Sequence, residues 1–193
     1  MTPTNNQDLD RAWRFTSEAE GDWSDDAGDP GGETKWGVPR NNWTDAQLIA
    51  LTGHPFSALT EEDAKTIYRI CYWQTLRCDE FPFPVNLALA DFAYNCGVAI
   101  ASKSLQRASG MTGSDVDGKI GPRSMRWATN AMNRVGPVAF ARRIGGRRRL
   151  WYIQRVQEQP EMGKFFNVWL QRCIDLAWFA AGEFAAKDKG GAA

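Results

Sequence analysis

Amphipathic helix patterns run through most of this chain, and they constrain its fold more than any other feature of the sequence. Apolar residues recur at the three- and four-residue spacing of a helix face, and no strand patterns alternate with them. The sequence therefore predicts a mainly α fold. We expect helices over residues 8–20, 85–96, 99–109, 123–133, 137–157 and 161–186, and two more that begin at Thr44 and Thr60.

Two stretches interrupt the helical pattern. Residues 21–42 read GDWSDDAGDPGGETKWGVPRNN, which is too rich in Gly, Asp and Pro for a regular helix. We expect a long loop or a small β-hairpin there, directly after the first helix, and long ordered loops often carry function. Pro82 and Pro84 mark the second break. We place a boundary between two lobes of one compact unit at this point, giving residues 1–84 and 85–193.

The composition narrows the class of protein. Hydrophobic residues make up 43% of the chain and charged residues 24%, which excludes a mostly disordered protein. Lys+Arg and Asp+Glu both number 23, so the overall charge gives no indication of nucleic-acid binding. No apolar run approaches the roughly 18 residues of a membrane-spanning helix. Residues 1–7 lack the pattern of a secretory signal. We therefore expect neither a signal peptide nor a transmembrane segment.

Metal and thiol chemistry have little support in the sequence. The single histidine, His54, lies in a loop-like stretch without a nucleophile motif, and we interpret it as a surface residue. The four cysteines form no C-x-x-C motif, which favours free thiols over a zinc site or a disulfide scaffold. We expect no metal and no cofactor.

Glu20 is the first candidate for catalysis. It follows Trp13 by seven residues and Thr16 by four, so it shares their face of the helix, which we expect to be buried. A carboxyl group at the end of an apolar stripe is partly desolvated, which raises its pKa and keeps it protonated, as a general acid requires. The alternative is an exposed glutamate at a frayed helix end.

The segment after Glu20 holds further candidates. Glycines around Asp29 allow a tight bend that brings this residue opposite Glu20, and two carboxylates in different environments are what a glycosidase needs. Thr34 can hold a water molecule or a substrate hydroxyl. Trp23 and Trp36 offer aromatic faces to sugar rings. The alternatives are that the aspartates only form turns and that the tryptophans only fix the loop.

Asp91 and Asn95 lie one helical turn apart in the apolar helix expected over residues 85–96. Polar groups in such a helix form either a buried hydrogen-bonded network, which we favour, or the wall of a cleft. Tyr94, on the adjacent face, lines a cleft or the core. The arginine-rich residues 142–149 form either a solvated helix face or a docking site for an anionic polymer.

These residues carry a resemblance to glycoside hydrolase family 108, N-acetylmuramidases that many bacteriophages and prophages encode as endolysins. Residues 20–23 (EGDW) and 29–38 (DPGGETKWGV) resemble its signature, which reads E-G-G-Y, a short spacer and D-P-G-G-x-T-x-x-G-I. Asp22 replaces the second Gly and Trp23 the Tyr, so the glutamate and an aromatic residue are retained. The resemblance continues into the family's predicted peptidoglycan-binding region through residues 91–97 (DFAYNCG), 105–108 (LQRA) and 116–122 (VDGKIGP).

The resemblance implies a lysozyme-like, two-lobed helical fold and an enzyme that cleaves the β-1,4 bond between N-acetylmuramic acid and N-acetylglucosamine in peptidoglycan. It implies Glu20 as the catalytic acid, with Asp29 as the second carboxylate and Thr34 assisting. We assign substrate binding to Trp23, Trp36, Asp91, Tyr94 and Asn95.

An endolysin accumulates in the cytoplasm of the host bacterium, and the resemblance implies that a holin gives it access to the periplasm and the cell wall. We expect a monomer that binds peptidoglycan and no nucleic acid. Two rival hypotheses stay open. One is a non-catalytic cell-wall-binding or phage structural protein on the same scaffold, which Asp22 in the motif favours. The other is an enzyme that acts on chitin or chitosan.

Overall fold

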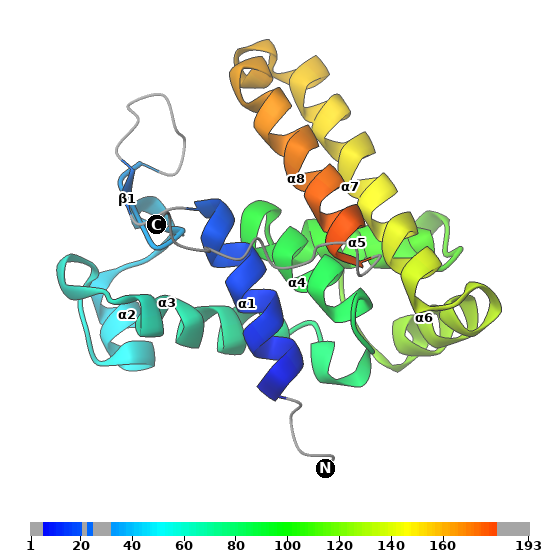
Figure 1. Cartoon of the computed structure of the whole chain (residues 1–193), viewed down its shortest axis with the longest axis horizontal. Helices are drawn as coiled ribbons and strands as arrows, with labels where there is room; N and C mark the ends of the chain where they lie inside the picture. The colour runs from blue at the N-terminus through cyan, green and yellow to red at the C-terminus, as the bar shows by residue number, and fades with distance from the viewer. Residues whose placement is uncertain (1–5, 21–22, 25–31, 181–193) are drawn as a thin grey trace, which may run out of the picture.

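The computed structural model describes residues 6–20, 23–24 and 32–180, and it is mainly α-helical (Figure 1). The expected fold class, with a small antiparallel sheet after the first helix, is confirmed. The helices are α1 (Asn6–Glu20), α2 (Asp45–Thr52), α3 (Glu61–Ile67), α4 (Val85–Cys96), α5 (Val98–Ala108), α6 (Pro122–Val135), α7 (Pro137–Glu158) and α8 (Phe166–Ala180). The strands are β1 (Trp23–Ser24), β2 (Thr34–Lys35) and β3 (Val38–Pro39).

Helix α4 lies at the centre of the molecule. Its sequence is apolar on every side, as expected of a helix surrounded by others, and residues 85–94 are all buried. It packs against α1, α5 and α7. In Figure 1, α2 and α3 lie to the left of it, and α5, α6 and α7 lie to the right. This arrangement is consistent with the lysozyme-like fold that the resemblance implies.

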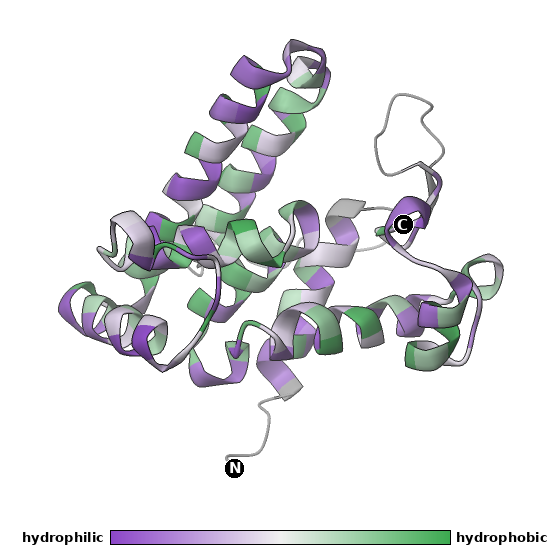
Figure 2. Ribbon diagram, turned by 180° about the vertical axis from the view of Figure 1, so that it is seen from behind, coloured by the Kyte–Doolittle hydropathy of each residue, from purple (hydrophilic) through white to green (hydrophobic). Residues whose placement is uncertain are grey.

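Helices α7 and α8 form a hairpin that projects from the rest of the molecule (Figure 1). Hydrophilic and hydrophobic residues alternate along both of its ribbons, as expected of two helices that bury one face each (Figure 2). The short 3-10 segment Pro160–Phe165 joins them. Among the described residues, no helix has the length and apolar character needed to cross a membrane.

The three short strands form one antiparallel sheet in the order β1-β2-β3. Trp23 pairs with Lys35 in the first ladder, and Lys35 pairs with Val38 in the second. Only Trp36 and Gly37 connect β2 to β3, with φ values of +53° and +76°. Positive φ at both central residues is what a two-residue hairpin with a type I′ turn requires, but it is unfavourable for a tryptophan because of its β-carbon. The strands lie directly beyond the carboxyl end of α1.

Most helix boundaries fall within two residues of those expected. Both predicted caps are present, since the side chains of Thr44 and Thr60 each accept a hydrogen bond from the backbone three residues later. The helix expected over 161–186 begins as the 3-10 segment, and α8 starts only at Phe166. Pro160 explains this start, because its ring lacks a backbone donor and fixes φ. Residues beyond 180 lie outside the described part.

Candidate active site

The described residues contain only part of the predicted catalytic set. Glu20 is the last residue of α1, and Trp23 begins β1, but the side chains of both lie outside the described part. Asp29 also lies outside it. Thr34 is in β2, and its ladder partner is Ser24, four residues after Glu20. The sheet therefore brings the backbone of Thr34 near the carboxyl end of α1.

Side-chain hydrogen bonds connect the β2–β3 hairpin to α4, to the loop at Ser57 and to the residues just before it. The Tyr94 hydroxyl of α4 donates a hydrogen bond to the Trp36 carbonyl oxygen at 2.8 Å. The Lys35 Nζ donates to the Ser57 carbonyl at 2.6 Å. The Thr34 hydroxyl donates to the Gly32 carbonyl at 3.2 Å. Tyr94 thus holds the strained turn at Trp36 in place and fixes the distance between the hairpin and α4.

A cavity of about 530 Å³ lies between this hairpin, the carboxyl end of α4 and the α7–α8 hairpin. It brings together three residues predicted for the site, namely Thr34, Tyr94 and Asn95. Its described lining is Thr34, Gly37, Pro39, Asn42, Tyr72, Tyr94, Asn95, Cys96, Gly97, Ile100, Trp151, Tyr152, Arg155, Met162, Phe165 and Trp169. Aromatic rings beside amide, hydroxyl and guanidinium groups suit a carbohydrate, whose rings offer apolar C–H faces and polar edges.

The far wall of the cavity was not predicted from the sequence. Trp151 and Arg155 come from α7, Phe165 ends the 3-10 segment, and Trp169 comes from α8. A signal was present, because each of these pairs has the four-residue spacing of a single helix face. The aromatic residues of the last helix also fit a core stripe, so their pattern alone does not indicate a binding surface.

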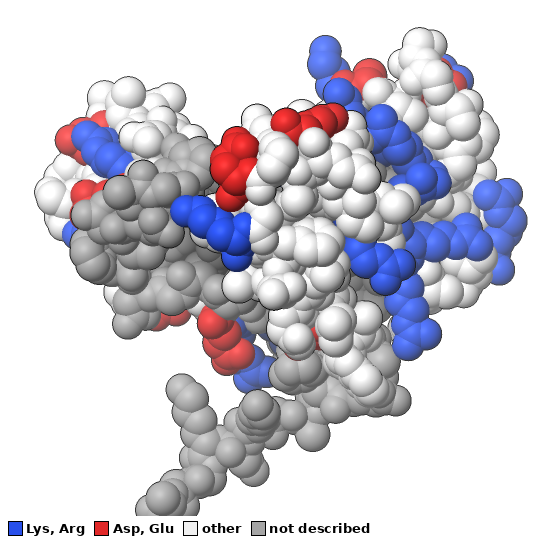
Figure 3. Space-filling view, turned by 90° about the horizontal axis from the view of Figure 1, so that it is seen from above, with Lys and Arg blue, Asp and Glu red and all other residues white. Residues whose placement is uncertain are grey.

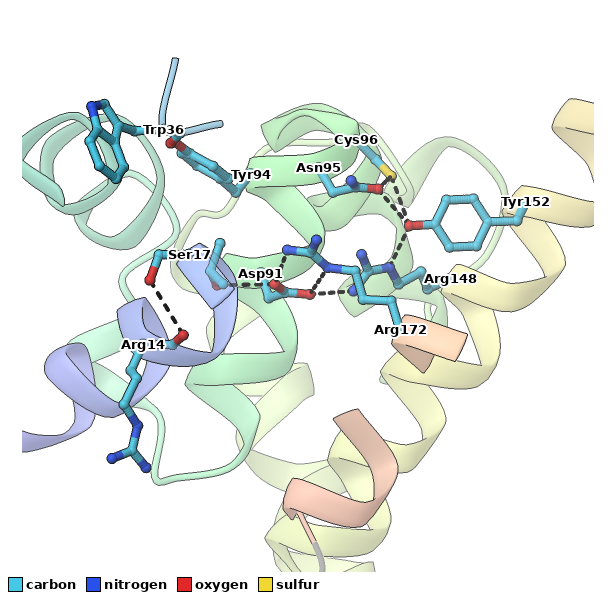
Figure 4. Close-up of polar contacts among 11 residues, drawn as sticks. Arg14, Ser17, Trp36, Asp91, Tyr94, Asn95, Cys96, Arg148, Tyr152 and Arg172 are labelled. Carbon is cyan, nitrogen blue, oxygen red and sulfur yellow. Dashed lines mark hydrogen bonds and ion pairs between the residues drawn. The ribbon is translucent and has the colours of Figure 1, made fainter. Parts of the chain in front are cut away.

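Asp91 is fully buried in the protein interior and is not among the described lining residues of this cavity. Figure 4 shows its polar contacts. Its Oδ1 accepts hydrogen bonds from Arg172 Nη2 at 2.6 Å and from the Thr16 hydroxyl at 3.0 Å. Its Oδ2 accepts from Arg148 Nη1. Burial alone would raise the pKa of Asp91, but the guanidinium groups of Arg172 and Arg148 hold it well below its usual range. Asp91 therefore fits the favoured prediction of a buried hydrogen-bonded network and not the assignment to substrate binding.

A chain of hydrogen bonds connects the Asp91 ion pair to the cavity (Figure 4). Arg148 Nε donates to the Tyr152 hydroxyl at 2.8 Å, and that hydroxyl donates to Asn95 Oδ1 at 2.6 Å. Asn95 is exposed and lines the cavity, whereas Arg148 is fully buried. The ion pair therefore orients the side chain that the cavity presents to a ligand.

Trp36 is half-buried and packs against the core, and it is not part of the described cavity lining. His54 follows the carboxyl end of α2, and its Nδ1 is 3.0 Å from Asp63 Oδ2. This contact ties the loop to the amino-terminal cap of α3.

All four cysteines lie in the described part and are free thiols. Burial raises the pKa of the cavity-lining Cys96 to about 11. Within the described ranges, no group of three or more His, Cys, Asp or Glu residues is placed to hold a metal ion.

Two family models match adjacent parts of the chain. Residues 13–97 match the family described as Glycosyl hydrolase 108, and residues 100–174 match the Predicted Peptidoglycan domain. Among solved structures, the chain is similar to that of SagA from Brucella abortus, with 26% identity and a TM-score of 0.72. The similarity covers 95% of this chain and 99% of SagA. No curated protein sequence matches the chain. The resemblance stated from the motifs is thereby confirmed.

Proposed function

Residues 13–97 belong to the glycosyl hydrolase 108 family, and from this premise we propose that the chain cleaves the β-1,4 bond between N-acetylmuramic acid and N-acetylglucosamine. The glycosyl hydrolase and peptidoglycan matches make it a peptidoglycan hydrolase. The observation that carries the proposal is the cavity, whose described lining comes from both matched segments. A glycan bound there contacts the hairpin of the first segment and the aromatic wall of the second.

In this mechanism, Glu20 protonates the leaving glycosidic oxygen. Its position supports the role, because it is one helical turn after Thr16 on α1 and directly precedes the sheet that contains Thr34. Asp29 positions a water molecule or stabilises the oxocarbenium-like transition state, and Thr34 assists by holding the water or a substrate hydroxyl. These roles come from the family motif.

Substrate binding falls to the residues around the cavity. Asn95 offers an amide whose oxygen is already oriented by Tyr152, so its nitrogen is available to a sugar hydroxyl or acetamido group. Trp151 and Trp169 offer ring faces to pyranose rings. Tyr94 acts by fixing the hairpin. We also assign Trp23 to substrate binding, on the strength of the motif.

The test is a digestion of purified peptidoglycan by the wild type and by the Glu20→Gln variant. Soluble fragments are identified by mass spectrometry before and after borohydride reduction. We expect reduced muramic acid ends with the wild type and none with the variant, because the amide cannot donate the proton. Glu18→Gln is the matched control, since Glu18 is an exposed carboxylate on the same helix and its loss leaves activity unchanged.

Four results would contradict the proposal in different ways. Reduced glucosamine ends identify a glucosaminidase and a different scissile bond. Equal activity of the Glu20→Gln variant removes Glu20 from the mechanism. Tight binding without any fragments favours a non-catalytic cell-wall-binding protein. Preferential cleavage of chitin or chitosan favours the rival hypothesis of an enzyme that acts on those polymers.

The biological role we propose is that of an endolysin that depends on a holin to reach the cell wall. It is supported by the motifs at residues 20–23 and 29–38, which resemble those of phage and prophage muramidases.

A further inference from the structure

The described lining of the cavity contains one residue that is charged at neutral pH, and that residue is Arg155. It is half-buried on α7 and faces the cavity together with Trp151, one helical turn before it. No carboxylate is among the described lining residues. The electrostatic character of this wall therefore favours an anionic group on the ligand.

Arg155 makes no hydrogen bond or ion pair through its side chain with the described residues. The nearest acidic residue along α7 is Glu158, and its carboxylate accepts a hydrogen bond from Gln154 at 2.7 Å instead. The neighbouring Arg148 has the opposite arrangement, because it is fully buried and bound to Asp91. Arg155 is thus a half-buried guanidinium whose donors are available to a ligand in the cavity.

Aromatic residues line the same cavity as this guanidinium. The rings of Tyr152 and Trp169 stack with centroids 4.7 Å apart and an interplanar angle of 16°. Phe165 continues the stack, with its centroid 5.9 Å from that of Trp169. Aromatic rings that line the same cavity as an available guanidinium suit a sugar that carries a carboxylate, since the sugar ring packs on an aromatic face and the carboxylate pairs with the guanidinium.

We infer that this wall recognises the muramyl residue of the glycan through a carboxylate that Arg155 binds, and so distinguishes peptidoglycan from uncharged chitin. The inference rests on the proposed function for the identity of the polymer. Muramic acid carries a lactyl group that N-acetylglucosamine lacks, and that group ends either in its own carboxylate or in the acidic stem peptide. Arg155 is then a specificity-determining residue supplied by the segment that matches the peptidoglycan domain.

The side of the molecule that α6 and α7 form also carries many positive charges. Lys and Arg side chains gather on the right of Figure 3, where α6 and α7 lie in Figure 1. Helices α6 and α7 contain Glu158 as their one acidic residue and have exposed arginines at 123, 126, 134, 142, 143, 147 and 149. These side chains attract any polyanion at long range, so a test must separate their effect from that of Arg155.

The experiment measures the binding of three soluble tetrasaccharides to the full chain in a Glu20→Gln background, which prevents turnover. The first carries stem peptides, the second has had them removed by an amidase, and the third is chitotetraose. Arg155→Gln is compared with Arg155→Lys, which keeps the charge, and with Arg147→Gln. Arg147 is exposed on the same helix and does not line the cavity, so it controls for general charge.

We expect Arg155→Gln to weaken binding of a carboxylate-bearing glycan by about tenfold to a hundredfold, as expected for the loss of a hydrogen bond to a charged group. Chitotetraose binding stays unchanged, Arg155→Lys restores part of the loss, and Arg147→Gln has little effect. Weakening of the first ligand alone assigns the carboxylate to the stem peptide. Weakening of the second alone assigns it to the lactyl group, whose carboxylate is free only after the stem peptide is removed. Weakening of both shows that Arg155 binds either carboxylate.

Equal weakening of all three ligands, or of none, would overturn the inference. Because the experiment measures binding, it tests the inference whether or not the wild type cleaves peptidoglycan. Failure of the proposed function is seen separately, as the absence of fragments from the wild type. Unchanged melting temperatures of the variants show that the differences arise in the cavity.

Discussion

At the scale of single residues, Asp91 shows how one carboxylate organises partners far apart in the sequence. It accepts hydrogen bonds from Arg148 and Arg172, 57 and 81 residues away. We expect Asp91→Asn to lower the free energy of unfolding by about 3–5 kcal/mol, because two buried guanidinium groups lose their counter-charge. Urea unfolding measures this loss. Asp115→Asn is the control, since its partner Arg123 is exposed and a surface pair contributes about 1 kcal/mol or less.

The ionisation of Asp91 makes this difference in unfolding free energy depend on pH. The pKa of Asp91 in the folded protein lies well below the value of about 3.9 for an unfolded aspartate. The stability that the ion pair contributes is therefore fully present above about pH 5 and is lost as the pH falls through the unfolded pKa toward the folded pKa. The difference in unfolding free energy between wild type and Asp91→Asn should narrow from pH 5 to pH 2. A constant difference would show that folding does not lower the pKa of Asp91.

Local pattern predicted part of this network. The four-residue spacing of Asp91 and Asn95 in an apolar helix indicated buried polar contacts, and Asp91 fits that prediction. The partners could not be found in the same way, because they lie on helices that meet α4 only in the folded chain. Arg148 did carry a signal, since it falls on the row of Phe140, Ile144 and Tyr152 along α7, and all of these residues are buried. Arg172 had no comparable signal.

At the scale of elements, the β2–β3 hairpin depends on α4 for its position. We expect Tyr94→Phe to keep the packing of the ring against Trp13 and Tyr68 but to release the Trp36 carbonyl. The stability loss should be about 1 kcal/mol, as for a typical hydrogen bond. Hydrolytic activity should fall several-fold more than this loss explains, because Thr34 and Gly37 line the cavity from the hairpin.

Thr44→Ala provides the control for this prediction. It removes the amino-terminal cap of α2, which also costs about 1 kcal/mol, at a residue that is not among the described lining of the cavity. Rates of peptidoglycan hydrolysis and unfolding free energies are measured for both variants. Equal activity of the two would mean that the Tyr94 hydroxyl stabilises the fold without positioning the hairpin.

Helices and caps were easier to predict than the hairpin. Apolar periodicity repeats over several turns, so each helix is specified by many residues, as in α5 and α6. The sheet consists of two-residue strands, and its pairing depends on the Trp36–Gly37 turn and on a contact with α4. A short turn with a tryptophan at positive φ leaves no pattern in the sequence, although Gly37 is compatible with it.

At the scale of the whole molecule, the cavity depends on elements from both ends of the chain. The proposed acid and the hairpin come from the first 40 residues, whereas the aromatic wall comes from residues 151–169. No local pattern specifies that these segments face each other.

The boundary between two lobes that we expect after residue 84 stays a prediction. The two family models meet between residues 97 and 100, after α4.

The shared core leads to the last prediction, that the chain unfolds in a single cooperative transition. Helix α4 packs on α1 from the first matched segment and on α5 and α7 from the second. The hydrogen bonds of Asp91 also join α1, α4, α7 and α8 through Thr16, Arg148 and Arg172. Neither segment can therefore unfold without exposing the apolar surface of the other, which is the condition for two-state behaviour.

Calorimetry and denaturant unfolding test this coupling in the full chain. The calorimetric and van't Hoff enthalpies should agree, and helix content and tryptophan fluorescence should report the same midpoint. The Asp91→Asn variant should shift both probes together to a lower midpoint, because the ion pair lies between the segments. Two separate transitions, or a shift confined to one probe, would mean that the segments are independent units and that the cavity lies between domains able to move apart.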